Sequence, residues 1–454
     1  RLVYPLISPV SDLIEGTDSE DQLARLMQNR LFWIGFAAGF GLLAWNMVWH
    51  FWEAWPRINF FGRKDLVFIH GFPAMTNRVN LYIIGFGYFA NLDVLFSLWF
   101  FYLVYWAQNG VFHRIGLDLG PGTGSTSDWE NLGAVFALVG WTLWSAREHL
   151  KDVFRKALDR NSQVDDSGEM LSYRTAVFGF VLGSGFCLLW LCMAGMEWYI
   201  GILLLLAMYG IYVGLGKIVC ESGLLYLAWG VSPQVLVTGL LGSVSMAGGT
   251  VTTLAFTEGM FFHGKGMFMS SWANGAKMAD LARADQRRLA KGMGLALLVG
   301  ISLCLYLSLG WGYEQGAYNF GGFPFRYGRD SVFSRAVKLL QSPQGPASSR
   351  LGFFGIGAVG MTVLTLLRYR FPWWPLHPVG FAVGGSGRAT KSTWSIFIAW
   401  ACKFLLLKMG GVTLYRQYRP LFTGLLSGYS LGVGLSFLVD VIWFPERGHW
   451  IHLY

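Results

Sequence analysis

The chain has 454 residues, of which 54% are hydrophobic and only 13% are charged. Soluble domains carry about 25% charged residues, so this composition excludes an ordinary soluble domain and indicates an integral membrane protein. The net charge of +9 at pH 7 is spread over loops, which suits contact with membrane lipids and argues against a nucleic-acid partner. The five cysteines show no paired ligand spacing, so they predict neither disulfides nor a metal site.

In chain order, residues 1–30 are polar and are expected to form a surface segment that leads into the membrane. The first span is predicted at 31–52, because it has the length of about 20 apolar residues that a bilayer requires. Residues 80–108 form a longer apolar segment with Asp93 near its middle. Its glycines leave open whether it is one tilted helix or a broken one.

Further spans are predicted at 132–146, 173–196, 198–217, 292–313, 351–367, 392–409 and 420–444. Two segments rich in Lys and Arg, near 147–160 and 277–291, are expected to be amphipathic helices on the cytoplasmic side. The sequence therefore predicts an all-α, polytopic transmembrane bundle of about 9–12 spans, broken or re-entrant segments included. We expect a main transmembrane domain at 31–350 and a C-terminal one at 351–454.

The segment FPWWPLHPVGFAVGGSGRATK, residues 371–391, carries three prolines and then four glycines. Proline removes a backbone donor and breaks helices, so residues 371–390 are not expected to form a continuous helix. Irregular backbone at membrane depth needs shelter, and we expect this element to pack against the span 392–409 or to line a cavity. The alternative is a surface loop whose tryptophans lie at the membrane interface.

Charged residues inside predicted spans are the first candidate site residues, because a charge at the bilayer centre costs about 2.5–3.5 kcal/mol and so avoids lipid. Asp93 could couple an ion or a proton or bind a substrate ammonium group; alternatively it pairs with a buried structural partner. Lys403 could pair with Asp440 or Asp93, or bind an anion. His377 could titrate near neutral pH and gate the protein, or it could be an interfacial hydrogen-bonding residue.

Two further groups complete the candidates. Lys217 and Glu221 stand four residues apart and could pair on one helix face, either at a site or at the membrane surface. Glu258 and His263 form a polar group among glycines, but one histidine and one carboxylate make a poor metal site. No catalytic arrangement and no metal site is predicted, and the sequence does not indicate a cofactor.

The strings RLFWIGFAAGF, FPWWPLHPVGFAV and STWSIFIAWACKFLLLKMGGVTLYRQYRPLFTGLLSGY occur together. With them the chain resembles a family of bacterial polytopic membrane proteins of unknown function, the paired N- and C-terminal domains of the 678x group. It is also distantly similar to the oligopeptide transporter family. The resemblance implies the inner membrane of a bacterium and gives no activity.

These observations favour a secondary transporter of an unknown, peptide-like substrate, because broken helices form the binding sites of many transporters. One alternative is a structural or accessory subunit of a larger membrane complex, and another is a membrane-embedded enzyme that acts on lipid-linked substrates. The expected partners are membrane lipids, with other membrane subunits or further copies of the chain.

Overall fold

The computed structural model describes residues 4–14, 26, 28–58, 64–117, 124–159, 161–224, 230–261, 268–319, 327–386, 389–445 and 448–449. Within these ranges seven helices are long and apolar enough to cross a membrane. The regular structure of these residues is helical apart from one antiparallel hairpin, β1 (Lys64–Leu66) with β2 (Met75–Asn77), which was not predicted. The predicted all-helical class is confirmed.

The chain divides into two compact units that interleave in the sequence. Unit 1 comprises residues 1–118, 217–228 and 363–454, and unit 2 comprises residues 119–216 and 229–362. The expected domains at 31–350 and 351–454 stay a prediction. Helices α9 (Trp198–Ser222) and α15 (Ser348–Arg370) each contribute residues to both units.

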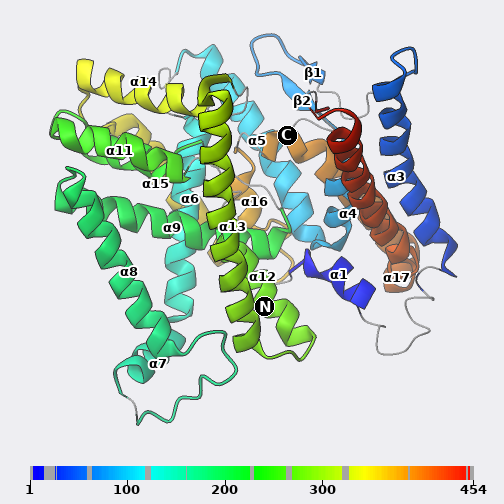
Figure 1. Cartoon of the computed structure of the whole chain (residues 1–454), viewed down its shortest axis with the longest axis horizontal. Coiled ribbons are helices and arrows are strands. Elements are labelled where there is room, and N and C mark those ends of the chain that lie inside the picture. Colours follow the sequence, from blue (N-terminus) through cyan, green and yellow to red (C-terminus); the bar gives the residue numbers. More distant parts are fainter. Residues whose placement is uncertain are drawn as a thin grey trace. The chain divides into compact units, whose positions relative to one another are not determined.

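Unit 1 is built around a close pair of helices, α3 (Arg30–Phe51) and α17 (Ala389–Trp443), which lie side by side in Figure 1. Glycines line their contact: a Cβ added to Gly35 would lie 1.9 Å from Leu421 O, and one added to Gly424 would lie 2.0 Å from Phe32 O. Small residues spaced four apart allow such backbone approach in membranes. Helix α17 bends sharply at Gly411, whose φ of 61° favours glycine.

The other helices of unit 1 are α1 (Ile7–Ile14), α4 (Leu81–Phe89), α5 (Leu92–Arg114) and α16 (Pro378–Val383). The apolar segment 80–108 is therefore broken, because Ala90 and Asn91 have extended backbone between α4 and α5. Residues 371–377 are not helical, which confirms the prediction of an interrupted element. Helix α16 packs on α5, where a Cβ on Gly380 would lie 2.5 Å from Ser97.

Unit 2 contains α6 (Thr126–Ser145), α7 (Arg147–Leu158), α8 (Tyr173–Met193), α10 (Pro233–Leu241), α11 (Gly248–Phe261), α12 (Phe268–Leu281), α13 (Gln286–Gln315), the 3-10 turn η2 (Ala317–Asn319) and α14 (Tyr327–Gln341), with most of α9 and α15. Glycines again bring two helices together. A Cβ on Gly133 of α6 would lie 1.9 Å from Phe354 O of α15, and one on Gly357 equally close to Glu130 O.

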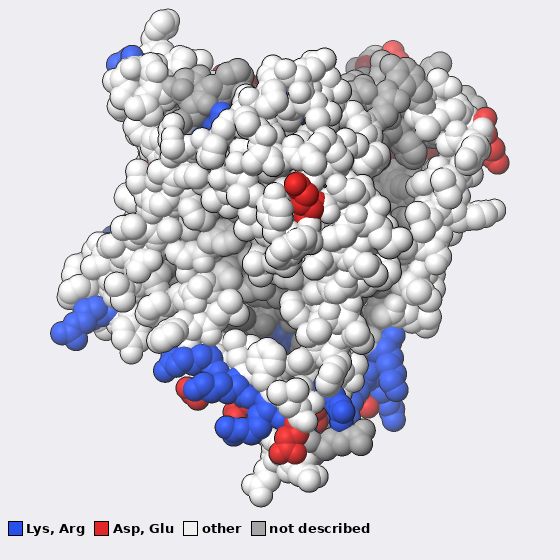
Figure 2. Space-filling view, turned by 90° about the vertical axis from the view of Figure 1, so that its left-hand side faces the viewer, with Lys and Arg blue, Asp and Glu red and all other residues white. Residues whose placement is uncertain are grey.

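The basic segments lie together in unit 2. Helix α7 confirms that the first basic segment is helical. The helix expected at 277–291 is two helices, α12 and α13, because residues 282–285 turn and Asp285 caps α13. The cytoplasmic location of both segments stays a prediction. Arg287 of α13 is 3.6 Å from Asp166, which follows α7. Figure 2 shows a face largely without charged side chains, with Lys and Arg gathered along its lower edge. This arrangement is typical of a membrane-facing surface with a basic rim.

Candidate functional site

A cluster of charged side chains lies in unit 1 where helices are interrupted. Asp93 is in the first turn of α5, directly after the break at 90–91, and not in mid-helix as the sequence suggested. Its Oδ2 is 3.3 Å from Nη2 of Arg368, near the end of α15. Asp93 thus has a polar partner, one that the sequence analysis did not name.

Arg368 has hydrogen-bonding capacity to spare. Its Nη1 is buried and has no hydrogen-bond partner among the described residues. Buried polar nitrogens are normally paired, and the planar guanidinium presents several donors suited to a carboxylate. Arg368 therefore offers an open donor beside Asp93.

The pair Lys217 and Glu221 of α9 belongs to the same cluster. Glu221 interacts electrostatically with both Lys217 and Arg368. Arg368 thus interacts with two acidic residues, Asp93 and Glu221. The structure brings together residues from α5, α9 and α15, so the pair is part of a larger group than the sequence indicated.

His377 joins the cluster through hydrogen bonds. It caps α16, with Nδ1 accepting from the Val379 N–H at 3.3 Å, and its own N–H donates to Ser97 Oγ at 2.6 Å. The Ser97 hydroxyl in turn donates to the backbone carbonyl oxygen of Asp93 at 2.6 Å. Burial, and then the positive charges of Arg368 and Lys217, hold the pKa of His377 at about 3. The expectation that His377 titrates near neutral pH is wrong, because a charged imidazole would be desolvated beside two cations.

This pKa predicts an acid-sensitive stability. Between pH 3 and about 6.5 the unfolded chain protonates His377 and the folded chain does not, so stability falls as the pH falls through that window. We expect wild type to lose about 2 kcal/mol more between pH 7 and pH 5 than His377→Asn, which keeps a capping acceptor but cannot titrate. Denaturant unfolding at both pH values measures this. Equal losses in the two proteins would show that His377 is not held neutral.

Lys403 does not pair with Asp440 or Asp93, as the sequence suggested. Its Nζ donates to the carbonyls of Tyr88 and Ala90, at 3.0 and 2.7 Å, at the point where α4 ends. The last carbonyls of a helix lack intrahelical partners. Lys403 therefore satisfies the broken backbone, and its role is to hold the helix break in place.

In unit 2, Glu258 of α11 forms an ion pair with Arg335 of α14. The two side chains line a pocket of about 20 Å³ that also includes Gln234 and Thr238 of α10, room for about one water molecule. Gln234 Oε1 is buried and has no partner among the described residues. His263, predicted to accompany Glu258, lies outside the described residues.

Sequence reasoning found Asp93, Glu221 and Lys217 but missed Arg368 and Ser97. Arg368 ends an apolar run, where a cation ordinarily reaches to the membrane surface, so its position gave no sign of a buried role. Ser97 is one hydroxyl in an apolar segment. Only the folded arrangement shows that its hydroxyl connects the backbone N–H of His377 to the backbone carbonyl of Asp93.

Within the described residues, seven helices that are long and apolar enough to cross a membrane indicate a helical membrane protein. The model of a family of unknown function, DUF6785, matches residues 1–451, and the chain belongs to that family. No curated protein matches the chain. The predicted family group is thereby confirmed, while the distant similarity to oligopeptide transporters and the bacterial origin stay predictions. A family of unknown function supplies no activity, so the function has to be argued from the site.

Proposed function

We propose that the protein is a secondary transporter of a bacterial inner membrane that carries peptide-like substrates with a free carboxylate. The observation that carries this proposal is Nη1 of Arg368, which is buried beside Asp93 and has no hydrogen-bond partner in the part of the chain that the structure describes. A substrate carboxylate would take this donor and form a charge-assisted hydrogen bond. Helices interrupted at the same place support the proposal, because substrate sites of many transporters form at discontinuous helices.

The charges of the cluster suggest how transport is coupled. Lys217 and Arg368 lie near the acidic residues Asp93 and Glu221, and His377 is neutral. Binding a substrate carboxylate adds one negative charge to this group. Uptake of a proton by the group would offset the added charge, and unbalanced charge in a poorly solvated place is costly. Substrate and proton would then cross together.

The test uses the full chain in liposomes with a pH-sensitive dye inside and trialanine as the probe. Wild type should acidify the lumen when trialanine is added, and Arg368→Lys, which keeps the charge but loses the planar fork, should lose at least about 10-fold in initial rate. Asp93→Asn should also lose the acidification of the lumen that trialanine causes in wild type. Glu148→Gln, on the exposed face of α7, is the matched control and should transport normally. Trialanine-dependent flux equal in wild type and Arg368→Lys would contradict the assignment.

The alternative of an accessory subunit is favoured by one observation: Asp93 and Lys403 both have partners inside unit 1. An accessory subunit needs no open site and should remain bound to another membrane protein. Purification of the chain from its native membrane in mild detergent distinguishes the two. A stoichiometric second chain, together with no trialanine-dependent flux, would support the accessory role.

A further inference from the structure

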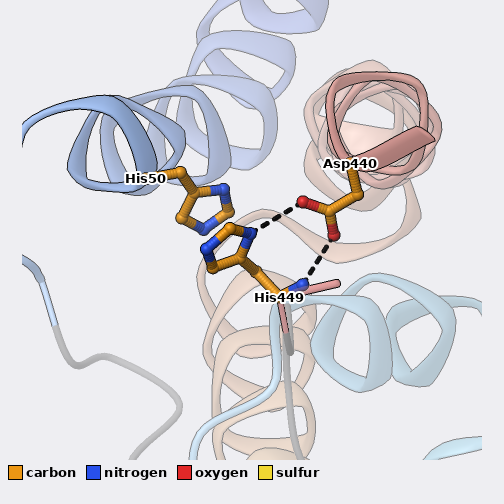
Figure 3. A group of neighbouring side chains, drawn as sticks. All are labelled: His50, Asp440 and His449. Carbon is orange, nitrogen blue, oxygen red and sulfur yellow. Dashed lines mark hydrogen bonds and ion pairs between the residues drawn. The ribbon is translucent and has the colours of Figure 1, made fainter. Parts of the chain in front are cut away.

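Three side chains that can ligate a metal meet at one end of the α3–α17 pair (Figure 3). His50 comes from the last turn of α3, Asp440 from the last turn of α17, and His449 from the segment after α17. One ligand atom of each lies within 4.8 Å of the others. We propose that His50, Asp440 and His449 bind a divalent transition-metal ion of the Zn²⁺ type, which clamps the ends of α3 and α17 together.

The carboxylate and one imidazole are already positioned by each other. Asp440 Oδ1 is 2.8 Å from Nδ1 of His449, and Asp440 Oδ2 accepts the backbone N–H of His449 at 2.8 Å. The contact holds His449 against the last turn of α17. A metal site needs such held ligands, because ligands that are free to move bind weakly.

His50 gives a second, independent observation in favour of a bound metal ion. Its ring stacks on that of His449 with centroids 3.8 Å apart and planes 11° apart. Its Nδ1 is buried and has no hydrogen-bond partner among the described residues. Phe444 stands edge-on to both rings and closes the group on an apolar side. An imidazole nitrogen that is buried and that no described residue contacts through a hydrogen bond is available to a metal ion.

The donor set selects the class of ion. Two imidazole nitrogens and one carboxylate oxygen suit Zn²⁺ and neighbouring transition metals, whereas Mg²⁺ and Ca²⁺ prefer oxygen ligands. Ligand atoms at about 2.0–2.1 Å from one tetrahedral ion lie about 3.3 Å from each other. Side-chain rotation therefore has to close the 4.8 Å spread by about 1.5 Å, and three protein ligands leave one coordination position for water.

The test is metal titration of the purified full chain after chelator treatment, with Zn²⁺ and Co²⁺ as probes and Mg²⁺ as the comparison ion. We expect one Zn²⁺ per chain, visible-range Co²⁺ absorption typical of a tetrahedral site, and no competition by Mg²⁺. His50→Gln and Asp440→Asn should each weaken Zn²⁺ binding at least about 100-fold. Zn²⁺ should raise the Tm of wild type, because a ligand that binds only the folded state stabilises it.

The matched control is His113→Gln, because His113 is an exposed histidine at the end of α5 and should bind Zn²⁺ like wild type. Two ligand variants are used so that poor folding of one leaves the other to decide, with a single symmetric gel-filtration peak as the criterion. Unchanged affinity in both ligand variants, or an equal loss in His113→Gln, would overturn the proposal. No stoichiometric binding to wild type would do the same. None of these outcomes depends on transport.

Discussion

Gly424→Ala should destabilise the protein by about 3 kcal/mol, although it adds one methyl group. The new Cβ would lie 2.0 Å from the Phe32 carbonyl oxygen and 2.9 Å from its carbon, so the backbones of α3 and α17 have to separate. Overpacking costs about 1–3 kcal/mol even where side chains can adjust, and here the contact is with backbone. Separation would also weaken the neighbouring contacts between α3 and α17. Reversible unfolding of the purified protein in mixed micelles measures the loss.

The control for this prediction is Gly434→Ala on the same helix. A Cβ at Gly434 meets nothing within 4 Å, and alanine favours helix by about 1 kcal/mol over glycine. Gly434→Ala should therefore be neutral or slightly stabilising. If both alanine variants unfold alike, the close approach of α3 and α17 is not what holds unit 1 together.

Lys403→Met should also cost about 3 kcal/mol. Methionine fills a similar volume but cannot donate, so the carbonyls of Tyr88 and Ala90 lose a buried partner. Each unsatisfied buried group costs about 1–3 kcal/mol. The ammonium also lies 4.8 Å from the Tyr415 ring centroid, a cation–π contact that the variant loses. Unfolding in mixed micelles gives the cost, and hydrogen exchange should show faster opening at residues 88–92.

Lys408→Met serves as the control, because Lys408 is an exposed residue of the same helix. Its replacement should change stability by no more than about 0.5 kcal/mol. Equal effects of the two substitutions would mean that Lys403 contributes only its charge and not its hydrogen bonds to the broken helix.

Local features of the fold follow from the sequence because their causes are local. Long apolar runs predicted most spans, and Pro372, Pro375 and Pro378 predicted the interruption that the structure shows at 371–377. The break at 90–91 was left open, because no proline marks it and glycines alone do not decide between a bend and a break. Lys403 explains it: a cation far along the chain supplies donors that the broken helix lacks.

Contacts between segments far apart in the chain could not be predicted from the sequence. Asp93 and Arg368 are 275 residues apart, and spacing along one helix gives no information on such a contact. The same holds for His50 and Asp440, whose helices meet because glycines let α3 approach α17. Charge within a span marks a residue as unusual but does not name its partner. For that reason Lys403 was assigned the wrong partners.

The most direct test of the proposed site is whether water reaches Asp93. In a background that lacks the five native cysteines, Asp93→Cys should react with a charged, water-soluble methanethiosulfonate, and trialanine should slow this reaction. Leu103→Cys, exposed on the same helix, should react only with a lipid-soluble maleimide. Reaction of Asp93→Cys with the lipid-soluble reagent alone would place this side chain against acyl chains and would contradict a transport site around Arg368.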